Sequence, residues 1–223
     1  SALLENFQFK LPSNASYVTD RKQSTFFASG SNIYSPTGTR VIKISINDSS
    51  SWLDPESVLV SFVLEATGAD TKHIYPVAGA YGFFRRLRIL AGNGVVLEDI
   101  SDYNKAHHLF EIQKSEEERT VSDALSFGYH TDSYGYVENN ITTFGANKLA
   151  VKGGSNSVVM FKPLAGILRQ EKFLPLKYLQ GITFELEIVN NLTDPVVAVA
   201  DCASTTANNS FGQDIVINDW TIR

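Results

Sequence analysis

Two apolar runs separated by a glycine-rich turn form the clearest pattern in the chain. The runs FFRRLRIL and VVLEDI flank the sequence GNG at positions 92–94. Glycine and asparagine accept the positive φ angles that a tight hairpin turn requires. Directly after the second run, Ser101 or Asp102 is a suitable N-cap for a helix. The pattern therefore predicts a β-hairpin that leads into a helix.

The helix is predicted over residues 102–119. Ile100, Tyr103, His107 and Phe110 recur at helical spacing, so they are expected on one face. The last residues of the segment, KSEEER, are charged and are expected to be solvated.

Alternating apolar and polar residues predict strands on both sides of the hairpin and helix. The segment RVIKISIN at residues 40–47 places three isoleucines on one face. Further strands are predicted at residues 57–65, 157–162, 182–188, 195–200 and 214–223. Their apolar faces consist of Ile42, Ile44 and Ile46 in the first strand, Val58, Val60, Phe62 and Leu64 in the second, and Ile182, Phe184, Leu186 and Ile188 in the strand at 182–188.

About eight strands with one inserted helix predict an all-β fold, an eight-stranded antiparallel jelly-roll sandwich. Residues 1–39 alternate little, and we expect them to form an extended N-terminal arm. Residues 40–223 are expected to form a single jelly-roll domain, with a long tyrosine-rich insertion at residues 120–156.

The arm and the insertion carry aromatic residues that an extended segment cannot bury alone. They are expected to dock either on the domain's own sheet or on a neighbouring subunit. The candidate subunit-interface residues are Phe7, Phe9, Tyr17, Phe26, Phe27, Tyr34, Tyr129, Tyr134 and Tyr136.

Composition and charge narrow the possible functions. A hydrophobic fraction of 43% in 223 residues is enough for a buried core. The net charge of -5 argues against a surface that binds nucleic acid strongly, because phosphates require an excess of Lys and Arg. Arg85, Arg86 and Arg88 form the tightest basic group, for which ion pairing or a subunit contact is expected. No segment approaches the roughly 18 apolar residues of a membrane span.

The sequence contains no pattern that predicts catalysis, a cofactor or a metal site. A single cysteine rules out an intrachain disulfide and favours assembly inside a cell. His107 and Glu111 at helical i, i+4 spacing could share a metal, but no third ligand has suitable spacing. The turn glycines lack the spacing of a phosphate loop. We therefore predict that the protein is not an enzyme. The residues considered as metal ligands or nucleophiles are His73, His107, His108, Glu111, His130 and Cys202.

The order of these features resembles a known family. The similar elements are GTRVIKISI, SWLDPESVLVSFVLEA, the hairpin block at residues 82–100, SDYNKAHHLF and FLPLKYLQGITFELEIV, which together span most of residues 36–190. In this order they resemble the jelly roll of major capsid proteins from the double jelly-roll lineage of DNA viruses. The resemblance implies a shell-forming protein whose strands stand upright in the capsid and whose long loops make the subunit contacts.

Members of that lineage carry two jelly rolls in tandem and form trimers, whereas this sequence holds one jelly roll's worth of residues. It is therefore either the amino-terminal half of a longer protein or a single jelly-roll subunit that assembles differently. The expected function is to form an icosahedral capsid in the virion, assembled inside the host cell from capsomers of this chain with other capsid proteins. The alternative is a carbohydrate- or receptor-binding jelly-roll module, such as a viral spike head, with tyrosines and asparagines at its loop tips.

Overall fold

The computed structural model describes residues 20–48, 50–67, 72–76, 79–115, 151–152, 154–192, 194–200 and 220–223. Several residues of the sequence predictions lie outside these ranges. They are Phe7, Phe9, Tyr17, Tyr129, Tyr134, Tyr136, His130 and Cys202. What the sequence predicts for them stays a prediction, as does the division into an arm and one domain.

The largest sheet has five strands in the order β1-β2-β11-β6-β7. All its pairings are antiparallel. Its strands are β1 (Ala28–Ser29), β2 (Val41–Ile46), β11 (Ile182–Ile188), β6 (Phe84–Ala91) and β7 (Val96–Ser101).

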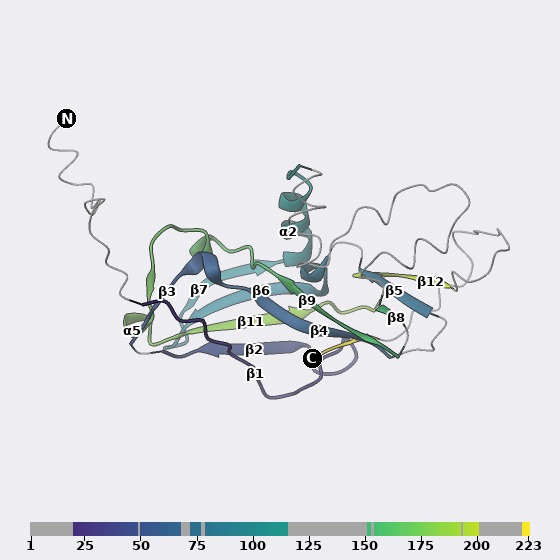
Figure 1. The fold of residues 1–223 in the computed structure, drawn as a ribbon, viewed down its shortest axis with the longest axis horizontal. Helices are drawn as coiled ribbons and strands as arrows, with labels where there is room; N and C mark the ends of the chain where they lie inside the picture. The colour runs from purple at the N-terminus through teal and green to yellow at the C-terminus, as the bar shows by residue number, and fades with distance from the viewer. Residues whose placement is uncertain are drawn as a thin grey trace.

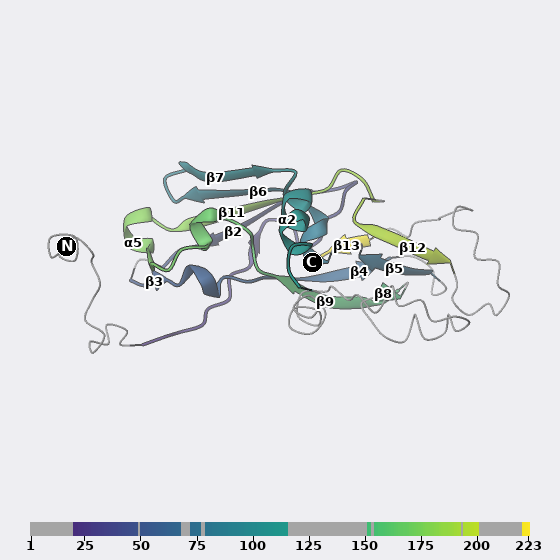
Figure 2. The same cartoon turned by 90° about the horizontal axis from the view of Figure 1, so that it is seen from above.

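A second sheet, in the order β13-β4-β9, lies across from the first, and Figure 2 shows the two as separate layers. Its strands are β13 (Trp220–Ile222), β4 (Val60–Ala66) and β9 (Asn156–Phe161). Two smaller sheets are formed by β12 (Val196–Ala200), β5 (Lys72–Pro76) and β8 (Val151–Lys152), and by β10 (Leu174–Pro175) and β3 (Trp52–Leu53). The helices are α2 (Tyr103–Glu111), α5 (Leu176–Leu179) and the 3₁₀ turns η1 (Pro55–Ser57), η2 (Ala80–Phe83) and η5 (Gly166–Leu168).

The core lies between the two main sheets and is rich in aromatic rings. Phe62 of β4 meets Phe84 of β6 edge to face, with ring centroids 5.4 Å apart. Phe84 also contacts Phe161 of β9 at 5.4 Å. Every second residue of β4 and β11 is buried, as the sequence alternation predicts. The predicted all-β antiparallel sandwich is therefore confirmed.

Strands from the first half of the chain pair with strands from the second half. β2 is hydrogen-bonded to β11, and β4 is hydrogen-bonded to β9, both antiparallel. This nested pairing agrees with the predicted jelly-roll connection. The count of eight strands stays a prediction, because several of the strands are two-residue pairings. Figure 1 shows the small sheets at the two ends of the elongated molecule, β3 with α5 at one end and β5 with β12 at the other.

The predicted hairpin is confirmed, and hydrogen bonds within the turn stabilise it. The amide of Ala91 donates to Val95 O at 2.8 Å, and the amide of Gly94 donates to Ala91 O at 2.8 Å. The φ of Gly94 is 83°, a value that favours glycine. The side chain of Asn93 accepts from the Val95 amide at 3.1 Å, which completes the turn.

The helix after the hairpin is shorter than the sequence pattern predicts. α2 ends at Glu111, and turns follow it up to Lys114, whereas residues 116–119 of the predicted helix lie outside the described ranges. Asp102 occupies the N-cap position with a φ of 49°, but its side chain accepts no helical amide. Phe110 has the helical spacing of the buried residues but is 55% exposed, because the end of α2 projects beyond the edge of the sandwich (Figure 1).

Candidate functional site

A row of paired charges crosses the outer face of the five-stranded sheet. Lys43 of β2, Glu185 of β11, Arg88 of β6 and Asp99 of β7 are directly opposite one another in the strand register. Lys43 contacts Glu185 at 2.7 Å, and Arg88 contacts Glu185 at 3.1 Å and Asp99 at 3.5 Å. We call these four residues, with Arg86, the ion-pair row. Cross-strand pairs of opposite charge stabilise a sheet, so the row holds four strands in register.

The strongest contact of the ion-pair row joins Arg86 and Asp99. Arg86 donates two hydrogen bonds to the Asp99 carboxylate, at 2.8 Å and 2.6 Å. These bonds lower the pKa of Asp99 and raise the pKa of Arg86. The ion pairing predicted for the basic group is confirmed for Arg86 and Arg88. Because these arginines are already paired with carboxylates, we interpret the row as stabilising a rigid sheet surface and not as a binding site for phosphate groups.

Beside the row lies a shallow polar depression of about 250 Å³. It is lined by Arg85, Arg86, Ser101, Asp102 and Glu187. Arg85 lies at a β-bulge, because the β6–β11 register shifts between Arg86 and Phe84. The depression mixes both signs of charge, and its lining has neither a histidine nor a cysteine, so it offers no evident nucleophile and base.

Two side chains anchor α2 to the sandwich. Tyr103 and His107 are the buried residues of this helix. The hydroxyl of Tyr103 accepts a hydrogen bond from the Leu164 amide at 2.8 Å. The ring of His107 packs edge-on against Tyr81, with centroids 4.0 Å apart. Burial lowers the pKa of His107 to about 3, so the imidazole is neutral at pH 7.

The sequence raised the possibility that His107 and Glu111 share a metal ion. Their nearest atoms, His107 Nε2 and Glu111 Oε1, are 3.6 Å apart. In the part of the chain that the structure describes, no third histidine, cysteine or carboxylate joins them as a potential ligand group. Glu111 instead contacts Lys114 at 2.9 Å. Glu111 and Lys114 therefore form an ion pair at the end of α2, next to the buried ring of His107.

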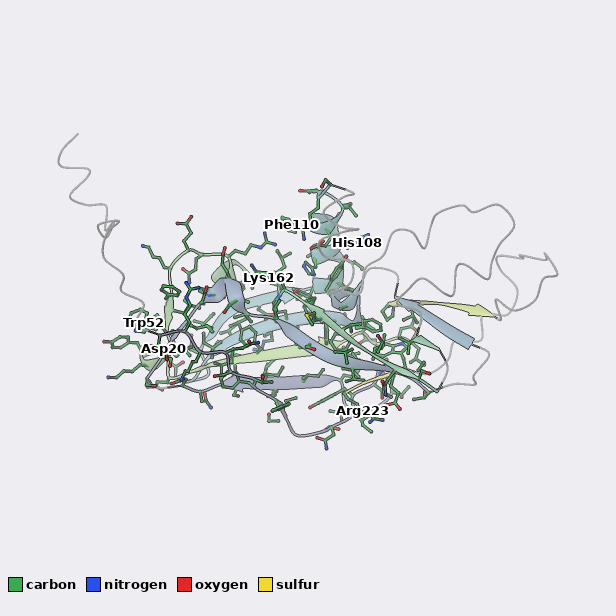
Figure 3. All side chains as sticks on the ribbon, in the orientation of Figure 1. Asp20, Trp52, His108, Phe110, Lys162 and Arg223 are labelled. Carbon is green, nitrogen blue, oxygen red and sulfur yellow. The ribbon has the colours of Figure 1, made fainter. Side chains whose placement is uncertain are left out.

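The last turn of α2 and the C-cap residue after it expose three large apolar side chains, Leu109, Phe110 and Ile112. We call them the α2 apolar surface. Phe110 is 55% exposed, although the sequence pattern places it with the buried residues. In Figure 3, Phe110 and His108 are labelled on the part of α2 that projects from the molecule.

A second apolar surface lies at the end of the sandwich that holds β3, β10 and α5. Trp52 of β3 is opposite Pro175 of β10, Phe173 precedes β10, and Tyr178 belongs to α5. All three aromatic side chains are exposed. We call Trp52, Phe173 and Tyr178 the aromatic end. Figure 3 labels Trp52 at this end, away from α2.

Three of the predicted interface residues fall within the described ranges, and they differ in their surroundings. Tyr34 is buried in the protein's own core and forms a β-bridge with Ile222. Phe26 is partly buried against the same core. Phe27 is 83% exposed, so of these three it alone is free to contact another molecule. A contact of Phe27 with a neighbouring subunit stays a prediction.

Sequence reasoning missed both apolar surfaces. Trp52 and Tyr178 stand in short segments, each near one proline, where a two-residue strand and a single helical turn leave no periodic pattern. One signal for the α2 apolar surface was available in the sequence. Leu109 and Phe110 are adjacent, so a helix cannot direct both toward the same narrow buried face.

Comparisons with known proteins give few similarities. No protein-family model matches the sequence. No curated protein matches it either.

Among the described helices, none is both long and apolar enough to cross a membrane.

Among solved structures, a chain from the cryo-EM structure of the Sputnik virophage is similar, with a TM-score of 0.48 and 12% sequence identity. The match covers 96% of this chain and 50% of the virophage chain. The chain therefore spans half the length of the solved chain that it matches.

Proposed function

We propose that this protein is a structural subunit of a virion shell, which assembles through contacts between copies of the chain and with other shell proteins. The observation that carries the proposal is the presence of two separate apolar surfaces, the α2 apolar surface and the aromatic end. They lie on different elements and at different places along the molecule (Figures 1 and 2).

The size of these surfaces supports contacts with other molecules. A large aromatic side chain has about 150–250 Å² of surface to bury. Three partly exposed side chains of this kind at one end amount to about a few hundred Å², which is the size of the largest apolar patch on a typical monomer, and such a patch is often functional. Each patch is smaller than the roughly 800 Å² per partner of a standard interface. Single contacts are therefore expected to be weak.

Two unlike surfaces on one molecule favour assemblies larger than a dimer. A contact in which the surface of one copy meets a different surface of the next generates a ring, a sheet or a filament. Many weak contacts of this kind become stable when the assembly closes. The ion-pair row and the aromatic core supply the rigid body that such a lattice requires.

The resemblance of the sequence elements to viral major capsid proteins supports the same proposal. In this proposal the protein has no catalytic role, requires no cofactor and binds nucleic acid only weakly. The net charge of -5 supports the last point.

The test is the assembly state of the purified chain across protein concentration and salt, by light scattering followed by negative-stain imaging. We expect trimers, pentamers, hexagonal sheets or closed particles above a threshold concentration. The double variant Trp52→Ser/Tyr178→Ser should raise that threshold about tenfold or more, since each 1.4 kcal/mol of lost contact energy is tenfold in affinity.

The matched control is Val158→Ser on the outer face of β9. Val158 and Trp52 are both 63% exposed, but Val158 belongs to neither apolar surface. We expect the control variant to assemble as the unmodified chain does. A monomer at every concentration would contradict self-assembly by this chain alone.

A carbohydrate- or receptor-binding module is the second candidate function. The exposed rings of Trp52 and Tyr178 favour it, because aromatic faces stack on the apolar faces of sugars. A glycan-array screen of the monomer would test it, with the Trp52→Ser/Tyr178→Ser variant as the control that should lose binding.

A further inference from the structure

The attachment of α2 to the sandwich depends on a small number of contacts. Of its nine residues, only Tyr103 and His107 are buried. Leu109 and Phe110 of its last turn are exposed. A helix of this length is not stable on its own in water, so its position depends on its contacts with the sandwich, chiefly those of these two buried side chains.

His107 is held in surroundings that suit only the neutral imidazole. The rings of Tyr81, Tyr103 and Phe161 surround it, with centroids at 4.0, 5.5 and 6.2 Å. Among the described residues, its Nδ1 atom has no hydrogen-bond partner. Its Nε2 atom is 3.6 Å from the Glu111 carboxylate, which is too long for a hydrogen bond. A proton added to this ring would therefore be poorly solvated.

The charged groups around His107 do not compensate for that proton. Lys114 after the helix, Arg169 after η5 and His108 on α2 itself all disfavour the charged form. In the described part of the chain, the negative group closest to the His107 ring is the Glu111 carboxylate, which is already paired with Lys114 at 2.9 Å.

Among the described residues of the other elements near α2, the carboxylate that acts on its buried side chains is Glu98 of β7, which influences Tyr103 and accepts hydrogen bonds from the Gly166 and Ile167 amides. From η2 the nearest titratable group is Tyr81, whose hydroxyl bonds to His108 Nδ1 at 3.1 Å. On β6, Arg86 and Arg88 pair with Asp99, and Arg85 lines the polar depression.

We propose that mild acid favours release of α2 from the sandwich, because the aromatic rings of Tyr81, Tyr103 and Phe161 and the unpartnered Nδ1 atom disfavour a protonated His107 at this position. The released helix binds the proton at the ordinary histidine pKa of about 6.5, whereas the docked helix binds it only near pH 3. Acidification through this window therefore favours the released state by linkage. Release uncovers the rings of Tyr81 and Phe161, which contact His107 from outside the helix, and moves the α2 apolar surface. The proposal does not depend on the proposed function.

Hydrogen exchange of the full chain, followed by mass spectrometry and corrected for the intrinsic pH dependence of amide exchange, tests this proposal. We expect the opening equilibrium constant of the α2 amides to rise about 30-fold between pH 7 and pH 5. The α2 amides should open more readily than those of β11 at every pH. This pH range stays above the titration of ordinary carboxylates, so other acidic groups contribute little.

Two variants identify the titrating group. His107→Phe keeps an aromatic ring of similar size and should remove the pH dependence of α2 opening. His108→Gln, which changes the neighbouring and less buried histidine, should keep it. If His107→Phe retains the 30-fold rise, the proposal is wrong.

The unmodified chain provides a test that needs no variant. If α2 and β11 amides open with the same constant at all pH values, α2 leaves only when the whole protein unfolds, and the proposal is wrong. This outcome decides the matter even if His107→Phe does not fold.

Discussion

Gly92 lies where the hairpin turn meets the end of α5. Its amide donates to Leu179 O at 2.9 Å and to Gly181 O at 3.0 Å. A Cβ atom placed on Gly92 would lie 1.7 Å from the carbonyl oxygen of Gln180. The sequence pattern explains Gly92 by the geometry of the hairpin turn. The structure shows a stronger reason for glycine here, which is that the backbone of Gln180 leaves no room for a side chain.

Replacing Gly92 with alanine should destabilise the protein strongly. Because the obstructing atoms belong to the backbone, the hairpin turn must move and lose its contacts, at a cost of about 3 kcal/mol or more in the free energy of unfolding. The matched change is Gly94→Ala, where φ is 83° and no atom lies within 4 Å of the added carbon. That variant should cost about 1 kcal/mol, from backbone strain alone. Urea unfolding measures both, and equal costs would contradict the role given to Gly92.

The ion-pair row is a property of strands rather than of single residues. Lys43, Glu185, Arg88 and Asp99 come from four strands, and they meet only because the register places them opposite one another. The sequence shows alternating polar residues in each strand, but it does not show which strand lies beside which. Exposed pairs are individually weak, so the row matters mainly as a network that resists register shifts.

Replacing Asp99 with asparagine should lower the free energy of unfolding at pH 7 by about 1 kcal/mol, because the two hydrogen bonds from Arg86 lose their charge. The pKa of Asp99 is lowered in the folded protein, so its contribution is present above the ordinary carboxyl value of 3.8 and is lost as the pH falls below it. The difference between the unmodified chain and Asp99→Asn should therefore shrink below about pH 4. It should also shrink in 1 M salt, where charges are screened.

The control for this prediction is Asp102→Asn. Asp102 is more exposed than Asp99 and approaches Lys105 only to 3.6 Å. Asparagine tolerates the left-handed conformation of this residue as well as aspartate does. We expect an effect of a few tenths of a kcal/mol at most. A pH-independent effect of Asp99→Asn would show that the contribution of Asp99 is not electrostatic.

Trp220 joins distant parts of the whole molecule. It is fully buried, its ring lies 4.9 Å from that of Phe83, and its Nε1–H donates to Leu192 O at 3.0 Å. The strand that carries it pairs with β4, and the next residues contact Tyr34 near the start of the described chain. Residues 220–222 therefore connect β4 of the second sheet with η2, Leu192 and Tyr34, which are far apart in the sequence.

Replacement by phenylalanine should destabilise the protein at Trp220 but not at Trp52. Trp220→Phe leaves a cavity and an unpaired carbonyl, and should reduce the free energy of unfolding by about 2–4 kcal/mol. Trp52→Phe should be close to neutral, because Trp52 is exposed. Unfolding curves measure the stability, and the fluorescence of each variant identifies the remaining tryptophan. Emission at short wavelength in Trp52→Phe and at long wavelength in Trp220→Phe is expected, and the reverse would contradict the assigned burial.

Much of the fold could be predicted from local patterns. The faces of β4 and β11 follow from strict alternation, and the hairpin follows from the glycines and asparagine of its turn. The helix start was also predictable from the change of period after Ile100. The predictions were poorer where a segment is short or its neighbour is distant, as for β3, α5 and the outer turn of α2.

The candidate site was less predictable than the fold, for a physical reason. An exposed phenylalanine and a buried phenylalanine have the same local sequence signal, and only the position of the rest of the molecule separates them. Phe110 has the spacing of a core residue yet lies beyond the edge of the sandwich, whereas Tyr34 has the surroundings of a loop residue yet is buried.

The sequence by itself determined the all-β class, the hairpin and the inward faces of the longer strands, because backbone geometry and side-chain alternation are local properties. Only the tertiary structure decided that Lys43, Glu185, Arg88 and Asp99 form one row, that Gly92 touches Gln180, and that His107 is enclosed by aromatic rings. These contacts join residues far apart in the chain, and they depend on which strands become neighbours when the two layers close on a common core.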